Sequence, residues 1–370
     1  MDRHYMQAAL NLAEKARGRT SPNPMVGAVI VKAGKVVGSG YHRRAGTPHA
    51  EINALNEAGA EAGGATLYVT LEPCCHYGRT GPCTEAVIEA GIARVVVAME
   101  DPNPLVAGRG IERMKAAGIE VDVGVMEDEA RELNEVFIKY ITTGKPFVTA
   151  KAAVSLDGKI AARTGRSKWI TSPEARRHGH KLRDGHDAVM VGIGTVLADD
   201  PLLTTRLDRS GGRDPVRVIL DSRARIPLNA RVLNCHSRAS AIIAVTADAP
   251  RGKLKMLREK GAGVLVVNDG PQVDLVKLVK LLGDKEITSV LIEGGSAVHA
   301  AAFNAGLVDK VAWFIAPKVI GGREAPGPVG GTGVDDPSAA VELGRLKVIN
   351  LGPDLLVEGY VKHNLQQSGW

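Results

Sequence analysis

The chain has 370 residues, which is too long for one typical hydrophobic core, so two domains are expected. Hydrophobic residues make up 44% of the chain and charged residues 24%, as in an ordinary soluble globular protein. The formal net charge of +6 is modest, the aromatic content is only 4%, and no basic tract is interleaved with aromatic residues, which argues against a nucleic-acid-binding protein.

The N-terminal stretch MDRHYMQAALNLAEKARG is amphipathic and charged, without the apolar core of a signal peptide. No stretch reaches the roughly 18 uninterrupted apolar residues that cross a bilayer. We therefore expect a cytoplasmic protein, in which clustered cysteine and histidine residues indicate a metal or catalytic site before they indicate a disulfide.

The first half of the chain predicts alternating helices and strands. A helix over 2–17 should end at Gly18, and two strands should follow, joined by a tight turn at Ala33-Gly34. Thr47-Pro48 predicts the N-cap and first position of a helix that ends at Gly59. The expected strands cover 26–32, 35–42, 65–72, 93–99 and 119–125, and further helices cover 83–91 and 108–118.

The pattern restarts after a junction at residues 143–146, which predicts two α/β domains over 1–145 and 146–370. The second half again alternates, with no internal repeat. We expect a helix over 172–183, and strands over 147–158, 186–192, 216–221, 239–245, 262–267, 287–295 and 309–320.

One histidine and two cysteines form the first candidate site. His49 and Glu51 are followed by Cys74 and Cys83, in the pattern H-x-E, then P-C, then a second cysteine. Zinc with three protein ligands keeps its fourth position for a water, whose pKa falls to near neutrality. Glu51, outside the metal shell, is suited to move the protons in a hydrolytic deamination.

Three alternatives to a small-molecule deaminase with a catalytic zinc site stay open on these residues. A structural zinc would recruit Cys75 or His76 as a fourth ligand, but it has no use for Glu51. A Cys74–Cys83 disulfide conflicts with a reducing compartment. The zinc pattern also occurs in enzymes that act on flipped nucleic-acid bases, although the low aromatic content speaks against one here.

Several motifs of the first half resemble the deaminase half of the bifunctional riboflavin-biosynthesis deaminase/reductase family. They are SPNPMVGAVIV, GYHRRAGTPHAE, VTLEPCCHYGRTGPC and EDPNPLVAGRG. The resemblance covers almost all of residues 1–145 and implies a cytidine-deaminase-like fold, Zn²⁺ on His49, Cys74 and Cys83, and Glu51 as the proton shuttle. It also places Asn23, His42, Asp101 and Asn103 near the substrate, although asparagines in PNP segments are common turn formers. The family more often has serine where Cys75 stands.

The second half lacks a dinucleotide fingerprint of the G-x-G-x-x-G type, because Leu197 stands at its third glycine position. The segment LIEGGSAVHAAAF is more informative. Its strand ends near Glu293, two glycines follow, and a helix begins near Ser296, where backbone N–H groups would bind a pyrophosphate. An ordinary strand–turn–helix connection would look the same.

The motifs KAAVSLDGKIA, SKWITS, GTVLADDPLLTTR, VILDS and LIEGGSAVHAAAFNAGLVDK resemble the reductase half of the same family. The resemblance implies a dihydrofolate-reductase-like α/β fold and NADPH as cofactor. It places NADPH near Ala153, Trp169, Thr195, Asp199, Ser222, Gly295, Ser296 and Ala297. It places the substrate near Ser167, Arg183, Leu203, Arg206 and Glu293.

Three further expectations concern the chemistry of this half. Arg183 and Arg206 are suited to bind the ribose phosphate through their planar guanidinium groups. Lys151 is expected to polarise or protonate the ribosyl group while the nicotinamide delivers hydride. Ser222-Arg223 places a hydroxyl and a cation where a 2′-phosphate would lie, whereas Asp221 alone would favour NAD.

The sequence thus predicts a bifunctional enzyme with Zn²⁺ and NADPH as cofactors. Its first domain would deaminate a phosphoribosylaminopyrimidine, and its second would reduce the ribosyl group to ribityl. The alternative is a nucleoside or nucleobase deaminase fused to an unrelated reductase-like domain. We expect a homo-oligomer with a small-molecule substrate and without a nucleic-acid or membrane partner.

Overall fold

The computed structural model describes residues 1–77, 81–207 and 212–362, and the chain divides into two units, Met1–Gly144 and Lys145–Trp370. Each unit has its own sheet. Within the described ranges, no helix is long and apolar enough to cross a membrane.

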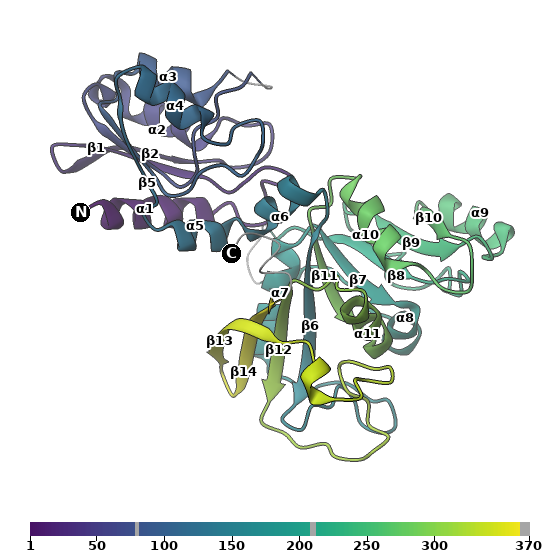
Figure 1. The fold of residues 1–370 in the computed structure, drawn as a ribbon. Coiled ribbons are helices and arrows are strands. Elements are labelled where there is room, and N and C mark those ends of the chain that lie inside the picture. Colours follow the sequence, from purple (N-terminus) through teal and green to yellow (C-terminus); the bar gives the residue numbers. More distant parts are fainter. Residues whose placement is uncertain (78–80, 208–211, 363–370) are drawn as a thin grey trace. The chain divides into compact units, whose positions relative to one another are not determined.

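The first unit is built on a five-stranded sheet in the order β2-β1-β3-β4-β5. Strands β1 and β2 form an antiparallel hairpin, whereas β3, β4 and β5 are parallel. Helices α2, α3 and α4 cover one face and α1 and α5 the other (Figure 1). The strands are β1 Gly27–Lys32, β2 Lys35–Tyr41, β3 Thr66–Val69, β4 Arg94–Val97 and β5 Glu120–Val123. The helices are α1 Asp2–Glu14, α2 Ala50–Ala58, η1 Gly59–Ala62, α3 Cys83–Glu89, α4 Arg109–Ala116, α5 Glu127–Leu133 and α6 Glu135–Thr143.

Helix α2 lies unusually close to strand β2, because two glycines face it. A Cβ atom on Gly38 would lie 2.3 Å from the carbonyl oxygen of Ala54, and one on Gly40 would lie 2.5 Å from that of Ala50. Neither contact is possible for a larger residue, so backbone packs directly on backbone. This packing fixes the helix that begins beside His49.

The expected elements of this unit are present, with corrections at the end of α1, which stops at Glu14 and not beside Gly18, and at the start of α2. The tight turn at Ala33-Gly34 has both residues at positive φ, and Gly59 ends α2 as predicted. The prediction that Thr47 caps this helix was wrong: the helix begins at Ala50 and His49 is its N-cap. The Thr47 hydroxyl instead donates to the carbonyl oxygen of Arg44 at 2.7 Å, a local bond that competes with capping.

The second unit is built on a nine-stranded sheet in the order β10-β9-β8-β7-β11-β6-β12-β14-β13. The strands from β10 to β12 in this order are parallel, and β14 and β13 add an antiparallel edge. The strands are β6 Phe147–Ser155, β7 Ala188–Gly192, β8 Val216–Leu220, β9 Ala241–Thr246, β10 Gly263–Asn268, β11 Ser289–Gly294, β12 Lys310–Ala316, β13 Leu343–Leu351 and β14 Asp354–Val361. The helices are α7 Pro173–Gly185, α8 Ile193–Asp199, α9 Arg251–Glu259, α10 Leu275–Gly283, α11 Ser296–Asn304 and η2 Pro337–Ala339.

Two large apolar clusters and a smaller one around Phe314 form the core of the second unit among the described residues. One of the large clusters includes Val148, Met190 and Leu278, and the other includes Val189, Ile219 and Leu257. Neighbouring residues such as Val189 and Met190 belong to different clusters because successive side chains of a strand point to opposite faces. Because the strands from β10 to β12 run parallel, their carboxyl ends lie at one edge of the sheet, where ligand sites form in such folds.

Candidate active sites

The predicted metal ligands converge in the first unit. His49 caps α2, Cys83 begins α3, and Cys74 lies on the segment after β3. Their ligand atoms lie within 4.8 Å of one another, with His49 Nδ1 at 3.2 Å from Cys83 Sγ and 3.6 Å from Cys74 Sγ. One imidazole and two sulfur donors at this spacing fit zinc and leave a fourth tetrahedral position for a reactant.

The two thiols of the site share a hydrogen bond that shifts their pKa values in opposite directions. Hydrogen bonds from Cys83 and His49 lower the pKa of the Cys74 thiol to about 4, whereas the bond to Cys74 and burial raise the pKa of Cys83. The backbone N–H of Cys83 also donates to Cys74 Sγ at 3.4 Å. The site therefore already stabilises a thiolate, which is the form that binds metal.

Neither of the two rival readings of the cysteines matches this geometry. All four cysteines of the chain are free thiols. Among the described residues, Cys75 and the exposed His76 stand outside the group of ligand atoms that could share one ion. The donor set is therefore a three-ligand site rather than a closed four-ligand cage.

Glu51 lies in the first turn of α2 and is 3% exposed. Burial, and then the negative charge on Cys74, raise the pKa of its carboxyl to about 7. The residue is not one of the three ligands, so its carboxyl stays available for proton transfer beside the metal position.

The predicted substrate residues of this unit lie in two groups. Asn23 Nδ2 lies 3.3 Å from His42 Nε2, and the ring of His42 stands edge-on to that of His49 with the ring centres 5.2 Å apart. Asp101 accepts a hydrogen bond from the backbone N–H of Asn103 at 2.9 Å. Burial, and then the charges of Glu72 and Cys74, raise the pKa of Asp101 to about 7.

Sequence reasoning missed Glu72, which connects the loop of Asp101 to the segment that carries Cys74. Its buried carboxylate accepts hydrogen bonds from the backbone N–H groups of Asp101, Gly108, Gly110 and Ile111 at distances of 2.8 to 3.1 Å. Glu72 precedes the ligand Cys74 by two positions. One side chain thus holds the loop that carries Asp101 against the segment that carries a metal ligand.

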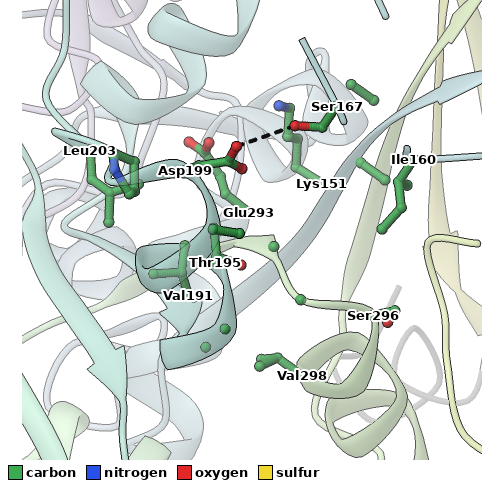
Figure 2. Close-up of a pocket in the computed structure, with 18 of the residues that line it drawn as sticks. Lys151, Ile160, Ser167, Val191, Thr195, Asp199, Leu203, Glu293, Ser296 and Val298 are labelled. Carbon is green, nitrogen blue, oxygen red and sulfur yellow. Dashed lines mark hydrogen bonds between the residues drawn. The ribbon is translucent and has the colours of Figure 1, made fainter. Parts of the chain in front are cut away.

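The second unit contains a cavity of about 1200 Å³ at the carboxyl ends of β6, β7, β8 and β11 (Figure 2). Lys151 and every residue that the family resemblance places in the reductase site line it, whereas Arg223 does not. The predicted residues that line it are Lys151, Ala153, Ser167, Trp169, Arg183, Thr195, Asp199, Leu203, Arg206, Ser222, Glu293, Gly295, Ser296 and Ala297. Two glycines and the first residue of α11 form a cradle in which a pyrophosphate would fit. They are Gly294, Gly295, which has φ 90°, and Ser296.

A buried ion pair organises one end of the cavity. Arg183 Nε and Nη2 donate to the carboxylate of Glu293 at 2.5 and 2.7 Å, and Nη1 donates to the carbonyl oxygen of Thr204 at 2.9 Å. Three of the five guanidinium N–H groups are therefore committed to protein acceptors, and the use of Arg183 as a phosphate ligand stays a prediction. Arg206 is less committed, since its Nη1 donates to the hydroxyl of Thr204 at 3.1 Å.

Lys151 lies beside this ion pair. Burial lowers the pKa of its ammonium group. The charge of Glu293 opposes this shift, and the charge of Arg183 adds to it. Its Nζ lies 5.4 Å from the centre of the Phe314 ring. Figure 2 shows Lys151 in the same part of the cavity as Ser167 and Asp199, whose side chains are hydrogen-bonded at 3.3 Å.

The cavity also includes residues that the sequence did not single out. His180 Nδ1 accepts a hydrogen bond from the backbone N–H of Arg206 at 3.3 Å, and burial followed by the charge of Arg183 lowers its pKa to about 4. The guanidinium of Arg176 stacks 4.4 Å from the centre of the Trp169 ring. Arg225 and Arg231 line the wall as well, whereas Arg223 does not belong to the lining.

Comparison with known protein families gives two matches. Residues 146–357 match the RibD C-terminal domain, and residues 1–99 match the cytidine and deoxycytidylate deaminase zinc-binding region. The predicted α/β fold class of the two halves is thereby confirmed.

Relatives cover nearly the whole chain. The riboflavin biosynthesis protein RibD of Aquifex aeolicus is 48% identical over 96% of this chain and 98% of its own length. The protein of that name from Escherichia coli is 43% identical over 96% and 98%. The solved structure of Acinetobacter baumannii RibD superposes with a TM-score of 0.87 at 40% identity, covering 97% of this chain and 98% of that one. A diaminohydroxyphosphoribosylaminopyrimidine deaminase/5-amino-6-(5-phosphoribosylamino)uracil reductase from Thermotoga maritima superposes with a TM-score of 0.82 at 38% identity, covering 97% and 98%.

Proposed function

Since the chain belongs to the RibD family of riboflavin-biosynthesis proteins, we propose that its two units catalyse two successive steps on one pyrimidine. The chain is a bifunctional enzyme, a zinc-dependent deaminase and an NADPH-dependent reductase. We assign deamination of the diaminohydroxyphosphoribosylaminopyrimidine to residues 1–144 and reduction of the ribosyl group of the resulting uracil to residues 145–370. The observation that carries this assignment is the three-ligand site with a buried Glu51 beside it, in a different unit from the cavity.

In the deaminase site, bound zinc supplies the Lewis acidity that makes water nucleophilic at neutral pH. The carboxylate of Glu51 takes the proton of that water and returns it to the leaving amino group. Asn23 and His42, which lie 3.3 Å apart, position the ring together with Asp101 and Asn103. Glu72 holds the loop of Asp101 in place.

In the reductase site, bound NADPH supplies the hydride, and the protein contributes orientation and charge. Arg206 binds the phosphate of the substrate, because its guanidinium is not committed to a carboxylate among the described contacts. Arg183 instead fixes the carboxylate of Glu293. This carboxylate accepts a hydrogen bond from a hydroxyl group of the ribityl chain. Lys151, with its lowered pKa, gives a proton to the ribosyl oxygen when the sugar ring opens.

Zinc analysis and two separate assays test this function. The purified chain should contain one equivalent of zinc, release ammonia from the phosphoribosylaminopyrimidine and then oxidise NADPH. Turnover of cytidine without turnover of the phosphoribosylaminopyrimidine would favour the alternative, a nucleoside deaminase fused to an unrelated reductase-like domain.

We also propose that the protein works as a homo-oligomer. Among the described residues, strand β13 is the last strand of the nine-stranded sheet, and Leu346 and Val348 on it are 61% and 65% exposed. A second copy that covers this strand would remove both apolar side chains from water. Light scattering after size-exclusion chromatography would report the mass, and a monomer at micromolar concentration would contradict the proposal.

A cytoplasmic location suits the free thiols of the metal site, which an oxidising compartment would convert to disulfides. Cell fractionation tests this part of the proposal, and recovery of the protein from an oxidising compartment would contradict it.

A further inference from the structure

The strand order of the second unit defines two directions along the cavity. Strand β11 ends at the cradle of Gly294 and Gly295, with β6 on one side and β7 followed by β8 on the other. Gly294 pairs with Val191 of β7, and Val191 pairs with Ile219 of β8. The end of β8 therefore lies two strand spacings, about 10 Å, from the cradle.

The substrate end lies in the direction of β6. Lys151 is on β6, and the titratable groups around it are Arg183, Glu293 and His180. The nicotinamide must meet the substrate there. A dinucleotide with its pyrophosphate in the cradle therefore extends its adenosine in the opposite direction, toward the end of β8. This argument rests on the proposed reductase function.

At the end of β8, the acidic residue that would select NAD is not available to a ligand. The side chain of Asp221 is fully buried and is not part of the cavity lining. Its Oδ2 accepts a hydrogen bond from the backbone N–H of Ile226 at 2.7 Å. Its Oδ1 has no hydrogen-bond partner among the described atoms, but it lies 3.9 Å from Nε of Arg225. The carboxylate thus lies at ion-pair distance from an arginine and is not exposed to ribose hydroxyls.

Arg225, the arginine beside Asp221, places a cation at the wall of the cavity. It lines the cavity with Ser222, and its side chain is 60% exposed. Ser222 Oγ accepts from the backbone N–H of Val273 at 3.1 Å, which leaves its own hydroxyl hydrogen free for an anionic ligand. Arg231 also lines the cavity, but its charge acts on Arg206, so it belongs to the substrate end.

We propose that Arg225, together with the hydroxyl of Ser222, binds the 2′-phosphate of NADPH and makes the enzyme prefer NADPH to NADH. A guanidinium offers a planar pair of donors that matches two phosphate oxygens. The buried Asp221, which lies close to one edge of the guanidinium, orients it. The assignment replaces the sequence-based expectation that Arg223 supplies this cation.

Calorimetric titration of the full-length protein with NADP⁺ and NAD⁺ tests the assignment without relying on turnover. Arg225→Gln should weaken NADP⁺ binding by about 10- to 100-fold, the range for a charge-assisted hydrogen bond, and should change NAD⁺ binding by less than about twofold. Arg223→Gln is the matched substitution at the competing arginine, and it should leave the preference for NADP⁺ unchanged. Titration with 2′,5′-ADP and 5′-ADP should give the same difference between the two variants.

Different failures of this experiment have different meanings. If Arg225→Gln weakens NADP⁺ and NAD⁺ equally, or if Arg223→Gln causes the selective loss, the assignment of Arg225 is overturned while the reductase function stands. If the wild-type protein binds neither nucleotide, the proposed reductase function falls, and the assignment falls with it.

Discussion

Replacement of Glu293 by glutamine should destabilise residues 145–370 by about 3 kcal/mol, because it leaves the buried charges of Arg183 and Lys151 without their counter-charge. The side chains of Arg183 and Glu293 are only 14% and 6% exposed, so solvent screens the pair weakly. Loss of one partner from such a pair typically costs about 3 to 5 kcal/mol.

The pKa of Glu293 gives the same magnitude. Although burial raises it, the charge and hydrogen bonds of Arg183, and then the charge of Lys151, lower it from an ordinary 4.5 to about 2. At about 1.4 kcal/mol per pKa unit, this shift corresponds to about 3 kcal/mol. Since the folded-state pKa lies below the unfolded one, the contribution is complete above about pH 4.5 and is lost as the pH falls toward 2.

Urea unfolding followed by tryptophan fluorescence measures this effect, because all three tryptophans of the chain stand in residues 145–370. The wild type should lose stability between pH 4.5 and 2, and Glu293→Gln should lack that part of the acid sensitivity. The double variant Arg183→Met, Glu293→Met serves as a control, since removal of both charges should recover much of the loss. A loss below about 1 kcal/mol for Glu293→Gln at pH 7 would refute the reasoning.

Three further predictions concern the first unit. Glu51→Gln should retain zinc and NADPH-dependent reduction but abolish ammonia release; simultaneous loss of both activities would contradict the separation of the two sites. Cys75→Ser should be nearly silent, because Cys75 stands outside the metal-binding group, and loss of the zinc equivalent in a metal analysis would argue against this. Glu72→Gln should lower the stability of the first unit by at least about 2 kcal/mol, since two of four backbone N–H groups lose their acceptor; an unchanged unfolding curve by circular dichroism would show that water replaces the carboxylate oxygen.

The metal site was predictable from the sequence because coordination chemistry restricts it to few residue types. His49, Cys74 and Cys83 are recognisable by residue type and by the H-x-E and P-C patterns, although the spacing of the two cysteines departs from the common P-C-x-x-C form, and Glu51 by its distance from His49. The alternation of helices and strands was predictable for the same kind of reason, because buried strands and amphipathic helices differ in hydrophobic period.

Other features depend on contacts that leave no trace in the local sequence. Glu72 binds backbone N–H groups 29 to 39 residues away, and any residue type except proline supplies such a group. Strands β13 and β14 were not predicted. Most residues of β13 are exposed, so this strand lacks the run of buried apolar residues that marks a strand in the sequence. The choice between Arg223 and Arg225 as the cation for the 2′-phosphate depends on the direction in which the side chain of Asp221 points.

The approach of α2 to the sheet has a consequence for anyone who redesigns the deaminase. Gly38 and Gly40 lie under the helix that begins beside His49, and a single added methyl group at either position would meet a carbonyl oxygen. The helix would have to lift, and the imidazole at its start would leave its two sulfur partners. Mutant libraries that aim at new pyrimidines should therefore keep both positions invariant and vary residues such as Asn23 or Asn103, which are expected to face the ligand.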